Sequence, residues 1–173
     1  MSNLPKIRVA VIGATGSVGE AVLDICGRFP ERFEIVALAA KSNEAKLTEL
    51  ASVHKARTLC LTEPHAAAFK ADGYNCLTGI DALSLIASDP DIDHVVFASS
   101  GVTAIKALQT ALREDKDVSL ANKESIVVAG PWVMPLIKRK DQLRPVDSEH
   151  SAVWQCLRED KKPEIKKIWI TAS

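Results

Sequence analysis

The sequence predicts an α/β fold with a doubly wound, mostly parallel sheet and helices on both of its faces. Apolar runs rich in β-branched residues alternate with segments of helical periodicity along the 173 residues. The connections between these segments are short, and there is no internal repeat or low-complexity tract. A glycine-rich loop also stands where the first apolar run meets the first helical segment. These features are typical of one parallel sheet with crossover helices.

The first units show the pattern clearly. Residues 7–13 (IRVAVIG) and 33–40 (FEIVALAA) are continuous apolar runs, typical of strands buried on both faces. The helical segment 17–29 is expected to end near Gly27 and to bury one stripe, made of Val18, Ala21, Val22, Ile25 and Cys26. A second helix is expected over 42–56, capped by Ser42 or Asn43.

The remaining elements follow in the same alternation. Further strands are expected at 58–61, 74–77, 94–100, 117–121, around 143–146 and at 164–172. Further helices are expected at 64–71, 79–89, 102–115, 123–140 and 148–160. The segment 123–140 should be interrupted near Gly130 and Pro131, because proline removes a helical hydrogen bond.

Composition narrows the class of protein. Hydrophobic residues make up 47% and charged residues 25%, an ordinary globular balance. Lys and Arg equal Asp and Glu at 22 each, which argues against a general nucleic-acid or membrane-surface binder. Four cysteines and four histidines show no zinc-ligand spacing, so we expect reduced thiols. The first residues lack an apolar segment long enough for a signal or a membrane span, and a cytoplasmic location is expected.

The loop GATGSVG carries Gly13, Gly16 and Gly19 at three-residue spacing. A sharp turn there brings backbone N–H groups and a helix N-terminus against a pyrophosphate, and a side chain at the closest point would block it. Thr15 and Ser17 add hydroxyl donors. Its position between strand and helix predicts a Rossmann-like dinucleotide site, with a purely structural turn as the alternative.

The end of the second strand indicates which dinucleotide is bound. NAD sites usually place an acid there, whereas this chain has Lys41, Ser42 and Asn43, with no acid before Glu44. A cation with polar neighbours suits the 2′-phosphate of NADP, although lysine after a strand is also a common solvated residue.

The stretch PVDSEHS (145–151) admits two interpretations. Asp147 and Glu149 would point the same way on an extended segment, and two converging carboxylates favour a divalent metal. Alternatively, Asp147 caps the next helix and the Glu149 charge interacts favourably with the helix dipole. Local sequence alone favours this second interpretation. His150 is expected to be a hydrogen-bonding residue, because hard Mg²⁺ prefers oxygen.

Three stretches together resemble the 1-deoxy-D-xylulose 5-phosphate reductoisomerase family of the non-mevalonate isoprenoid pathway. They are GATGSVG, LANKES (120–125) and PVDSEHSAVWQ (145–155), and the resemblance covers essentially the whole chain. It implies an amino-terminal fragment, with ITAS (170–173) beginning the family's Ser-Gly-Gly-Pro-Phe segment. Residues 1–146 would form the NADPH-binding Rossmann-like domain, and 147–173 would begin a truncated catalytic domain.

The resemblance also implies a reaction and roles for particular residues. An NADPH- and metal-dependent reductoisomerase would convert 1-deoxy-D-xylulose 5-phosphate to 2-C-methyl-D-erythritol 4-phosphate, as a homodimer when full length. The cofactor residues would be Thr15, Gly16, Ser17 and Val18 at the pyrophosphate, Lys41, Ser42 and Asn43 at the 2′-phosphate, and Asn122 and Glu124 at the nicotinamide half. The catalytic site would hold Lys123, Ser148, Glu149 and Ser173 at the sugar phosphate substrate, and Asp147 and Glu149 at Mg²⁺ or Mn²⁺. The fragment alone would be inactive.

The chain departs from the family at two places. Ser42 stands directly before Asn43, where the family has a basic residue, and the segment ASSG (98–101) differs from the family's glycine- and alanine-rich turn. Two other functions stay open. One is another NADP-dependent reductase, such as an aspartate-semialdehyde dehydrogenase, which needs a nucleophilic cysteine. The other is a non-catalytic NADPH-binding module.

Overall fold

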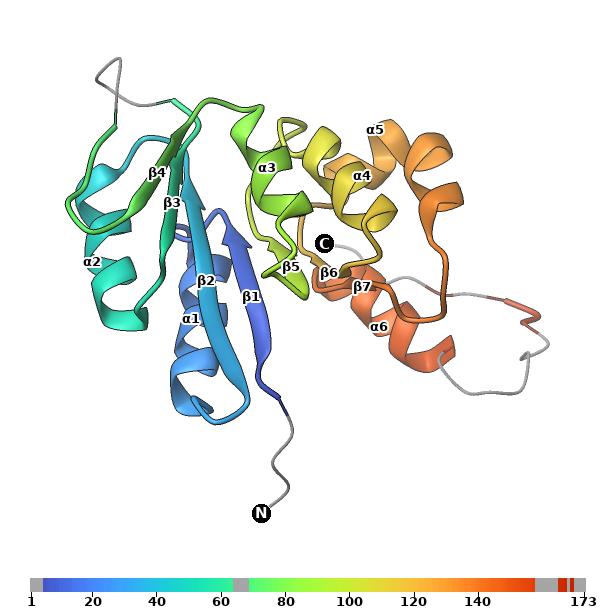
Figure 1. Ribbon diagram of the computed structural model, residues 1–173. Helices are drawn as coiled ribbons and strands as arrows, with labels where there is room; N and C mark the ends of the chain where they lie inside the picture. Colours follow the sequence, from blue (N-terminus) through green and yellow to red (C-terminus); the bar gives the residue numbers. More distant parts are fainter. Residues whose placement is uncertain (1–4, 64–68, 158–164, 168, 170–173) are drawn as a thin grey trace.

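A seven-stranded sheet forms the centre of the computed structural model, in the order β4-β3-β2-β1-β5-β6-β7 (Figure 1). The structure describes residues 5–63, 69–157, 165–167 and 169. Every neighbouring pair of strands is parallel. The chain progresses outward in one direction from β1 to β4 and in the other from β5 to β7. The expected doubly wound sheet is therefore confirmed, with its switch point between β1 and β5.

The elements have the following bounds. The strands are β1 Ile7–Ile12, β2 Phe33–Ala40, β3 Thr58–Leu61, β4 Asn75–Thr78, β5 His94–Phe97, β6 Asp117–Leu120 and β7 Leu143–Pro145. The helices are α1 Ser17–Arg28, α2 Glu44–His54, α3 Ala82–Ser88, α4 Ile105–Arg113, α5 Lys123–Val133, the 3₁₀ turn η1 Met134–Leu136 and α6 Ser148–Leu157.

Two hydrophobic cores lie on opposite faces of the sheet, because side chains alternate along each strand. From β1, Val9 and Val11 join the core under α1 and α2. Ala10 and Ile12 point the other way and join the core under α3, α4 and α5. Both faces of the central strands are therefore dry, as continuous apolar sequences such as 7–12 require.

The buried face of α1 differs from the expected stripe. Gly19, Leu23 and Cys26 are buried, whereas Val18 and Ile25 are exposed, and the helix continues past Gly27 to Arg28. The cause is the glycine turn that precedes the helix: a Cβ on Gly19 would overlap the Gly13 carbonyl oxygen. Gly19 must therefore face that turn, and this contact fixes how the helix is rotated.

The expected break near Gly130 and Pro131 is also wrong. Helix α5 runs continuously through both residues, and its regular part ends at Val133, before η1. Pro131 lies in the last turn of α5, so the hydrogen bond that it removes is close to the helix end, and η1 begins three residues later.

Two further expected elements fall partly outside the described residues. In the segment 64–71, the described residues 69–71 are not helical. In the segment 164–172, residues 165–167 and 169 have no regular structure. The other positions of both segments lie outside the described part of the chain.

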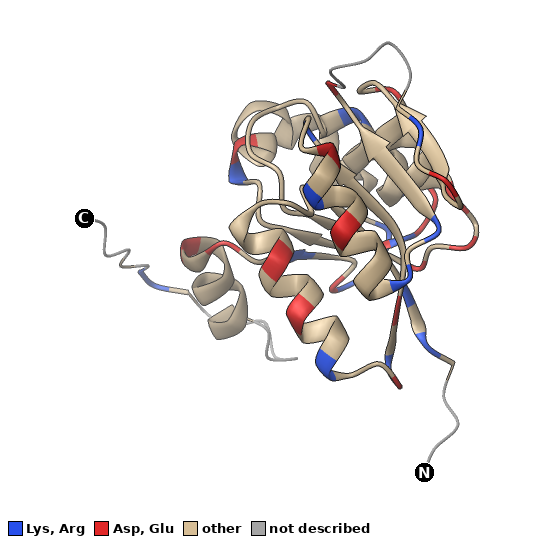
Figure 2. Ribbon diagram, turned by 90° about the vertical axis from the view of Figure 1, so that its left-hand side faces the viewer, with Lys and Arg blue, Asp and Glu red and all other residues tan. Residues whose placement is uncertain are grey.

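The described part of the chain shows its charge distribution, its helix lengths and the state of its cysteines. Basic and acidic residues are interspersed along the ribbon rather than gathered by sign (Figure 2). None of the helices in the described ranges is long and apolar enough to cross a bilayer. The four cysteines are free thiols, as expected, with Cys26 and Cys60 buried and Cys156 exposed.

Candidate functional site

A cleft of about 560 Å³ lies at the carboxyl edge of the sheet. It spans the switch point between β1 and β5, where open α/β sheets bind their ligands. Its walls come from the turns after five strands, β1, β2, β3, β5 and β6; they include Gly13, Thr15, Gly16, Ser17, Val18, Lys41, Glu63, Ser99, Ser100, Thr103 and Glu124.

The glycine turn forms one wall of this cleft, and two of its glycines are required by packing. Gly13 has φ +92°, and a Cβ there would lie 2.5 Å from the Ser99 backbone nitrogen. Gly19 faces the same turn from inside α1. These two residues press the loop after β1 against both the loop after β5 and the start of α1, and they leave no space for a methyl group.

Gly16 serves a different purpose, because a side chain at this position would meet no close contact. A Cβ on Gly16 would have the Gly13 carbonyl oxygen at 3.5 Å as its neighbour, which is ordinary contact. Gly16 is also the N-cap of α1, and no side chain caps that helix. The first N–H groups of a helix have no partner within the helix. They therefore offer donors and a positive dipole end to an anion in the cleft.

At the end of β2, Lys41 meets a residue that the sequence did not single out. The Lys41 ammonium lies 3.3 Å from a Glu63 carboxylate oxygen, and both side chains line the cleft. Glu63 follows β3 closely, as Lys41 follows β2, and β2 and β3 are neighbours. The sequence could have indicated Glu63 as a site residue, because the ends of two strands that pair in a parallel sheet lie side by side. Asn43 caps α2 by accepting from the Lys46 N–H at 3.2 Å, so the expected cap is confirmed.

Asn122 is a buried polar residue, with 1% of its surface exposed, and its side chain joins two segments of the chain. Its amide nitrogen donates to the carbonyl oxygens of Ser99 and Gly101 at 2.8 and 2.5 Å. Its amide oxygen accepts from the Ser125 N–H at 3.0 Å and caps α5. The side chain thereby fixes the loop after β5 against the start of α5.

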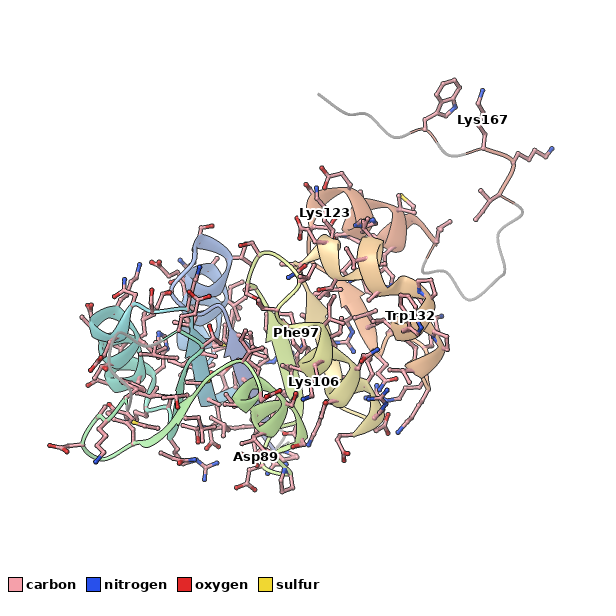
Figure 3. The ribbon with its side chains drawn as sticks, turned by 90° about the horizontal axis from the view of Figure 1, so that it is seen from above. Asp89, Phe97, Lys106, Lys123, Trp132 and Lys167 are labelled. Atoms are coloured by element: carbon pink, nitrogen blue, oxygen red, sulfur yellow. The ribbon has the colours of Figure 1, made fainter. Side chains whose placement is uncertain are left out.

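The two residues after Asn122 face different cavities. Glu124 lines the cleft, whereas Lys123 lines a second cavity of about 220 Å³ between α5, β7 and α6. Asp147, His150 and Trp154 border that second cavity together with apolar side chains. Figure 3 shows Lys123 at the end of α5 nearest to α6. Its ammonium lies 3.8 Å from a Glu149 carboxylate oxygen.

The expected extended geometry of Asp147 and Glu149 is wrong, because α6 begins at Ser148. Asp147 does follow the carboxyl end of β7, but its Oδ1 accepts from the His150 N–H at 3.0 Å as a helix cap. The same oxygen lies 2.8 Å from His150 Nδ1, so the expected hydrogen-bonding role of His150 is found. In Glu149, the hydrogen bond of its own backbone N–H, that of the Ser148 hydroxyl and the charge of Lys123 lower the carboxyl pKa.

The carboxylates of Asp147 and Glu149 are suitable ligands for a hard divalent cation, but two carboxylates supply only part of a coordination shell. Carboxylate oxygens are the ligands that Mg²⁺ and Mn²⁺ prefer, and Glu149 is exposed at the first turn of α6. Among the described residues there is no group of three or more His, Cys, Asp and Glu side chains placed to hold a metal. Ser173 lies outside the described residues, so its expected contact with the substrate phosphate stays a prediction.

Two family models match this chain, one over its larger amino-terminal part and one over its last residues. Residues 9–130 match the family model for 1-deoxy-D-xylulose 5-phosphate reductoisomerase. Residues 143–173 match the model for the C-terminal domain of the same enzyme.

Individual relatives agree with these matches. The reductoisomerase of Anaeromyxobacter sp. (strain K) is 40% identical over 171 residues, covering 96% of this chain and 44% of the relative. The enzyme of Zymomonas mobilis, solved in complex with NADPH, is 33% identical with a TM-score of 0.77, covering 88% of this chain and 41% of that one. A reductoisomerase solved in complex with magnesium is 33% identical with a TM-score of 0.78, covering 88% of this chain and 40% of that one. This chain thus spans less than half the length of these relatives, and by the match of residues 9–130 it belongs to the 1-deoxy-D-xylulose 5-phosphate reductoisomerase family.

Proposed function

We propose that this chain supplies the NADPH-binding part of an enzyme that converts 1-deoxy-D-xylulose 5-phosphate to 2-C-methyl-D-erythritol 4-phosphate. The observation that carries the proposal is the turn of Gly13, Gly16 and Gly19, which opens onto the cleft at the switch point. The relative from Zymomonas mobilis, solved with NADPH, supports the choice of cofactor.

The cofactor would lie across the cleft. The end of the glycine turn and the start of α1 would bind the pyrophosphate through backbone N–H groups, with Thr15, Gly16, Ser17 and Val18. Lys41 would pair with the 2′-phosphate, with Ser42 and Asn43 beside it. Asn122 would act by fixing the loop after β5, and Glu124 would face the nicotinamide half from across the cleft.

The substrate would lie toward the second cavity. Asp147 and Glu149 would hold Mg²⁺ or Mn²⁺, as the relative solved with magnesium supports. The ion would stabilise negative charge on substrate oxygens while the carbon skeleton rearranges. Lys123, 3.8 Å from Glu149, would place a positive charge beside the same oxygens, and Ser148 would offer a hydroxyl.

Other parts of the proposal concern the whole protein. Residues 1–146 would form the NADPH-binding domain and 147–173 the start of the catalytic domain, in a cytoplasmic homodimer. A thiol-based semialdehyde dehydrogenase is the weaker candidate, because burial raises the pKa of Cys26 and raises that of Cys60 to about 12. Neither thiol lines the cleft.

The test is an assay of NADPH oxidation with 1-deoxy-D-xylulose 5-phosphate and manganese. A full-length protein should turn over, and its Asp147→Asn and Glu149→Gln variants should lose turnover while NADPH binding stays nearly intact, because the glycine turn is a separate site. The 173-residue chain should bind NADPH without turnover. Turnover that needs no metal, or that survives either substitution, would overturn the proposed metal site.

A further inference from the structure

The hydroxyl of Ser99 has no hydrogen-bond partner in the structure. Its oxygen is buried, while the residue itself is half-buried and lines the cleft. It lies two residues after the end of β5, across the switch point from the glycine turn. A buried hydroxyl without a partner loses its hydrogen bonds to water, so it destabilises the protein that carries it.

The backbone of Ser99 is held on two sides. Its nitrogen lies against Gly13, where a methyl group would approach to 2.5 Å. Its carbonyl oxygen accepts from the Asn122 amide at 2.8 Å. The side chain therefore keeps one freedom, which is rotation about χ1 between staggered positions. A hydrogen-bond acceptor placed in the cleft could therefore bind this hydroxyl without displacing another partner.

We infer that Ser99 is a cofactor-binding residue, whose hydroxyl donates a hydrogen bond to a phosphate or ribose oxygen in the nicotinamide-side half of the dinucleotide. The inference rests on the proposed function. The position of Ser99 selects this half of the cofactor. In the sheet, β5 lies on the far side of β1 from β2, and under the proposed function the Lys41 end of the cleft, after β2, would hold the adenosine side. A pyrophosphate on the glycine turn would place its nicotinamide side over the loop after β5.

The chain offers a matched control. Ser84, on α3, has the only other serine hydroxyl among the described residues that is buried without a partner, and it does not line the cleft. Substituting either serine by alanine removes one such hydroxyl. Both changes should leave the thermal midpoint of the ligand-free chain equal or higher. Only Ser99→Ala should alter binding.

The experiment measures the dissociation constants of NADPH and of adenosine 2′,5′-diphosphate for the wild-type chain and the two variants. We expect Ser99→Ala to weaken NADPH by about tenfold, as for one hydrogen bond to a charged or polar acceptor. The same variant should bind adenosine 2′,5′-diphosphate unchanged, because that fragment lacks the nicotinamide half. Ser84→Ala should bind both ligands like wild type.

Equal NADPH affinity in wild type and Ser99→Ala would overturn the inference. So would an equal loss for the adenosine fragment, which would place the hydroxyl at the other half of the cofactor. A lower thermal midpoint for Ser99→Ala would mean that the hydroxyl stabilises the protein, and this result also counts against the inference. Failure of the wild-type chain to bind NADPH is a separate outcome, which would refute the proposed function itself.

Discussion

The Oδ1 atom of Asp147 lies 2.8 Å from Nδ1 of His150, and the same oxygen accepts the His150 backbone N–H at 3.0 Å. This carboxylate therefore caps the first turn of α6. The two interpretations of PVDSEHS are compatible, because a cap needs one oxygen as an acceptor and a metal needs negative charge. Substitutions can separate them.

The substitution Asp147→Asn should preserve the capping of α6 and abolish metal binding. Asn is as good an N-cap as Asp, so we expect the free energy of unfolding to change by less than about 0.5 kcal/mol. Asp147→Ala should cost about 1 kcal/mol, because the His150 N–H loses its acceptor. Urea unfolding measures both changes. Manganese binding, followed by paramagnetic resonance, should be lost in both variants of the full-length protein. Equal stability of the two variants would contradict the capping role.

Lys41→Ala should weaken NADPH by about tenfold or more and leave NADH almost unchanged, because only NADPH carries the 2′-phosphate. Fluorescence titration with both cofactors measures this. Wild type should prefer NADPH, and a preference for NADH would refute the assignment.

Glu63→Gln should have the opposite effect on the same site. Its carboxylate lies 3.3 Å from the Lys41 ammonium and would compete with the phosphate. Removing that exposed charge should strengthen NADPH binding by roughly twofold to fivefold. An unchanged affinity for NADPH in Glu63→Gln would place the 2′-phosphate elsewhere.

The three glycines of the turn should separate folding from binding. Gly16→Ala should change stability by no more than about 1 kcal/mol, because its Cβ meets ordinary contacts, and it should weaken NADPH by at least about tenfold. Gly13→Ala and Gly19→Ala should cost about 1–3 kcal/mol, because their Cβ atoms have no space. Thermal unfolding and NADPH titration of the three variants measure these effects. Wild-type NADPH affinity in Gly16→Ala would contradict the proposed pyrophosphate position.

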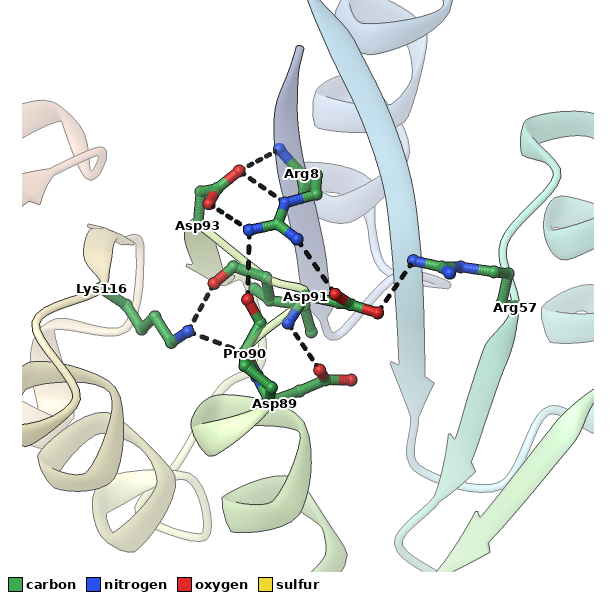
Figure 4. A network of polar contacts seen from close by, with 8 residues as sticks. Arg8, Arg57, Asp89, Pro90, Asp91, Asp93 and Lys116 are labelled. Carbon is green, nitrogen blue, oxygen red and sulfur yellow. Dashed lines mark hydrogen bonds and ion pairs between the residues drawn. The ribbon is translucent and has the colours of Figure 1, made fainter. Parts of the chain in front are cut away.

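Asp93 should make stability depend on pH in acid. Its carboxylate accepts the Arg8 backbone N–H at 2.9 Å and the Arg8 guanidinium at 3.0 and 2.8 Å (Figure 4). The hydrogen bond from the Arg8 side chain lowers the pKa of Asp93. A carboxyl group with a lowered pKa stabilises the fold above its unfolded pKa of about 3.9, and this stabilisation is lost as the pH falls through the folded value.

Asp93→Asn should therefore be less stable than wild type at pH 7, and the difference should shrink as the pH is lowered past about 4. Urea unfolding over a pH series measures it. Asp24→Asn is the control, because Asp24 forms an exposed ion pair with Arg28 within α1 and should change stability by less than about 0.5 kcal/mol. A difference for Asp93→Asn that stays constant with pH would contradict this account.

The sequence alone was sufficient for the alternation of strands and helices and for the position of the glycine turn. These features depend on short-range periodicity and on residues a few positions apart, such as Gly13 and Gly16. The cap by Asn43 was also predictable, because a cap and its N–H lie three residues apart.

Tertiary structure decided the rest, because it depends on which distant segments become neighbours. Pairing of β2 with β3 brings Glu63 to Lys41, although 22 positions separate them in the chain. The contact of Gly19 with the turn at Gly13 sets the rotation of α1 and leaves Val18 and Ile25 exposed, against the apolar pattern. Packing of the loop after β5 on Gly13 and Asn122 leaves the Ser99 hydroxyl without a partner beside the cleft. No local periodicity reports such contacts, since each joins residues that only the folded sheet brings together.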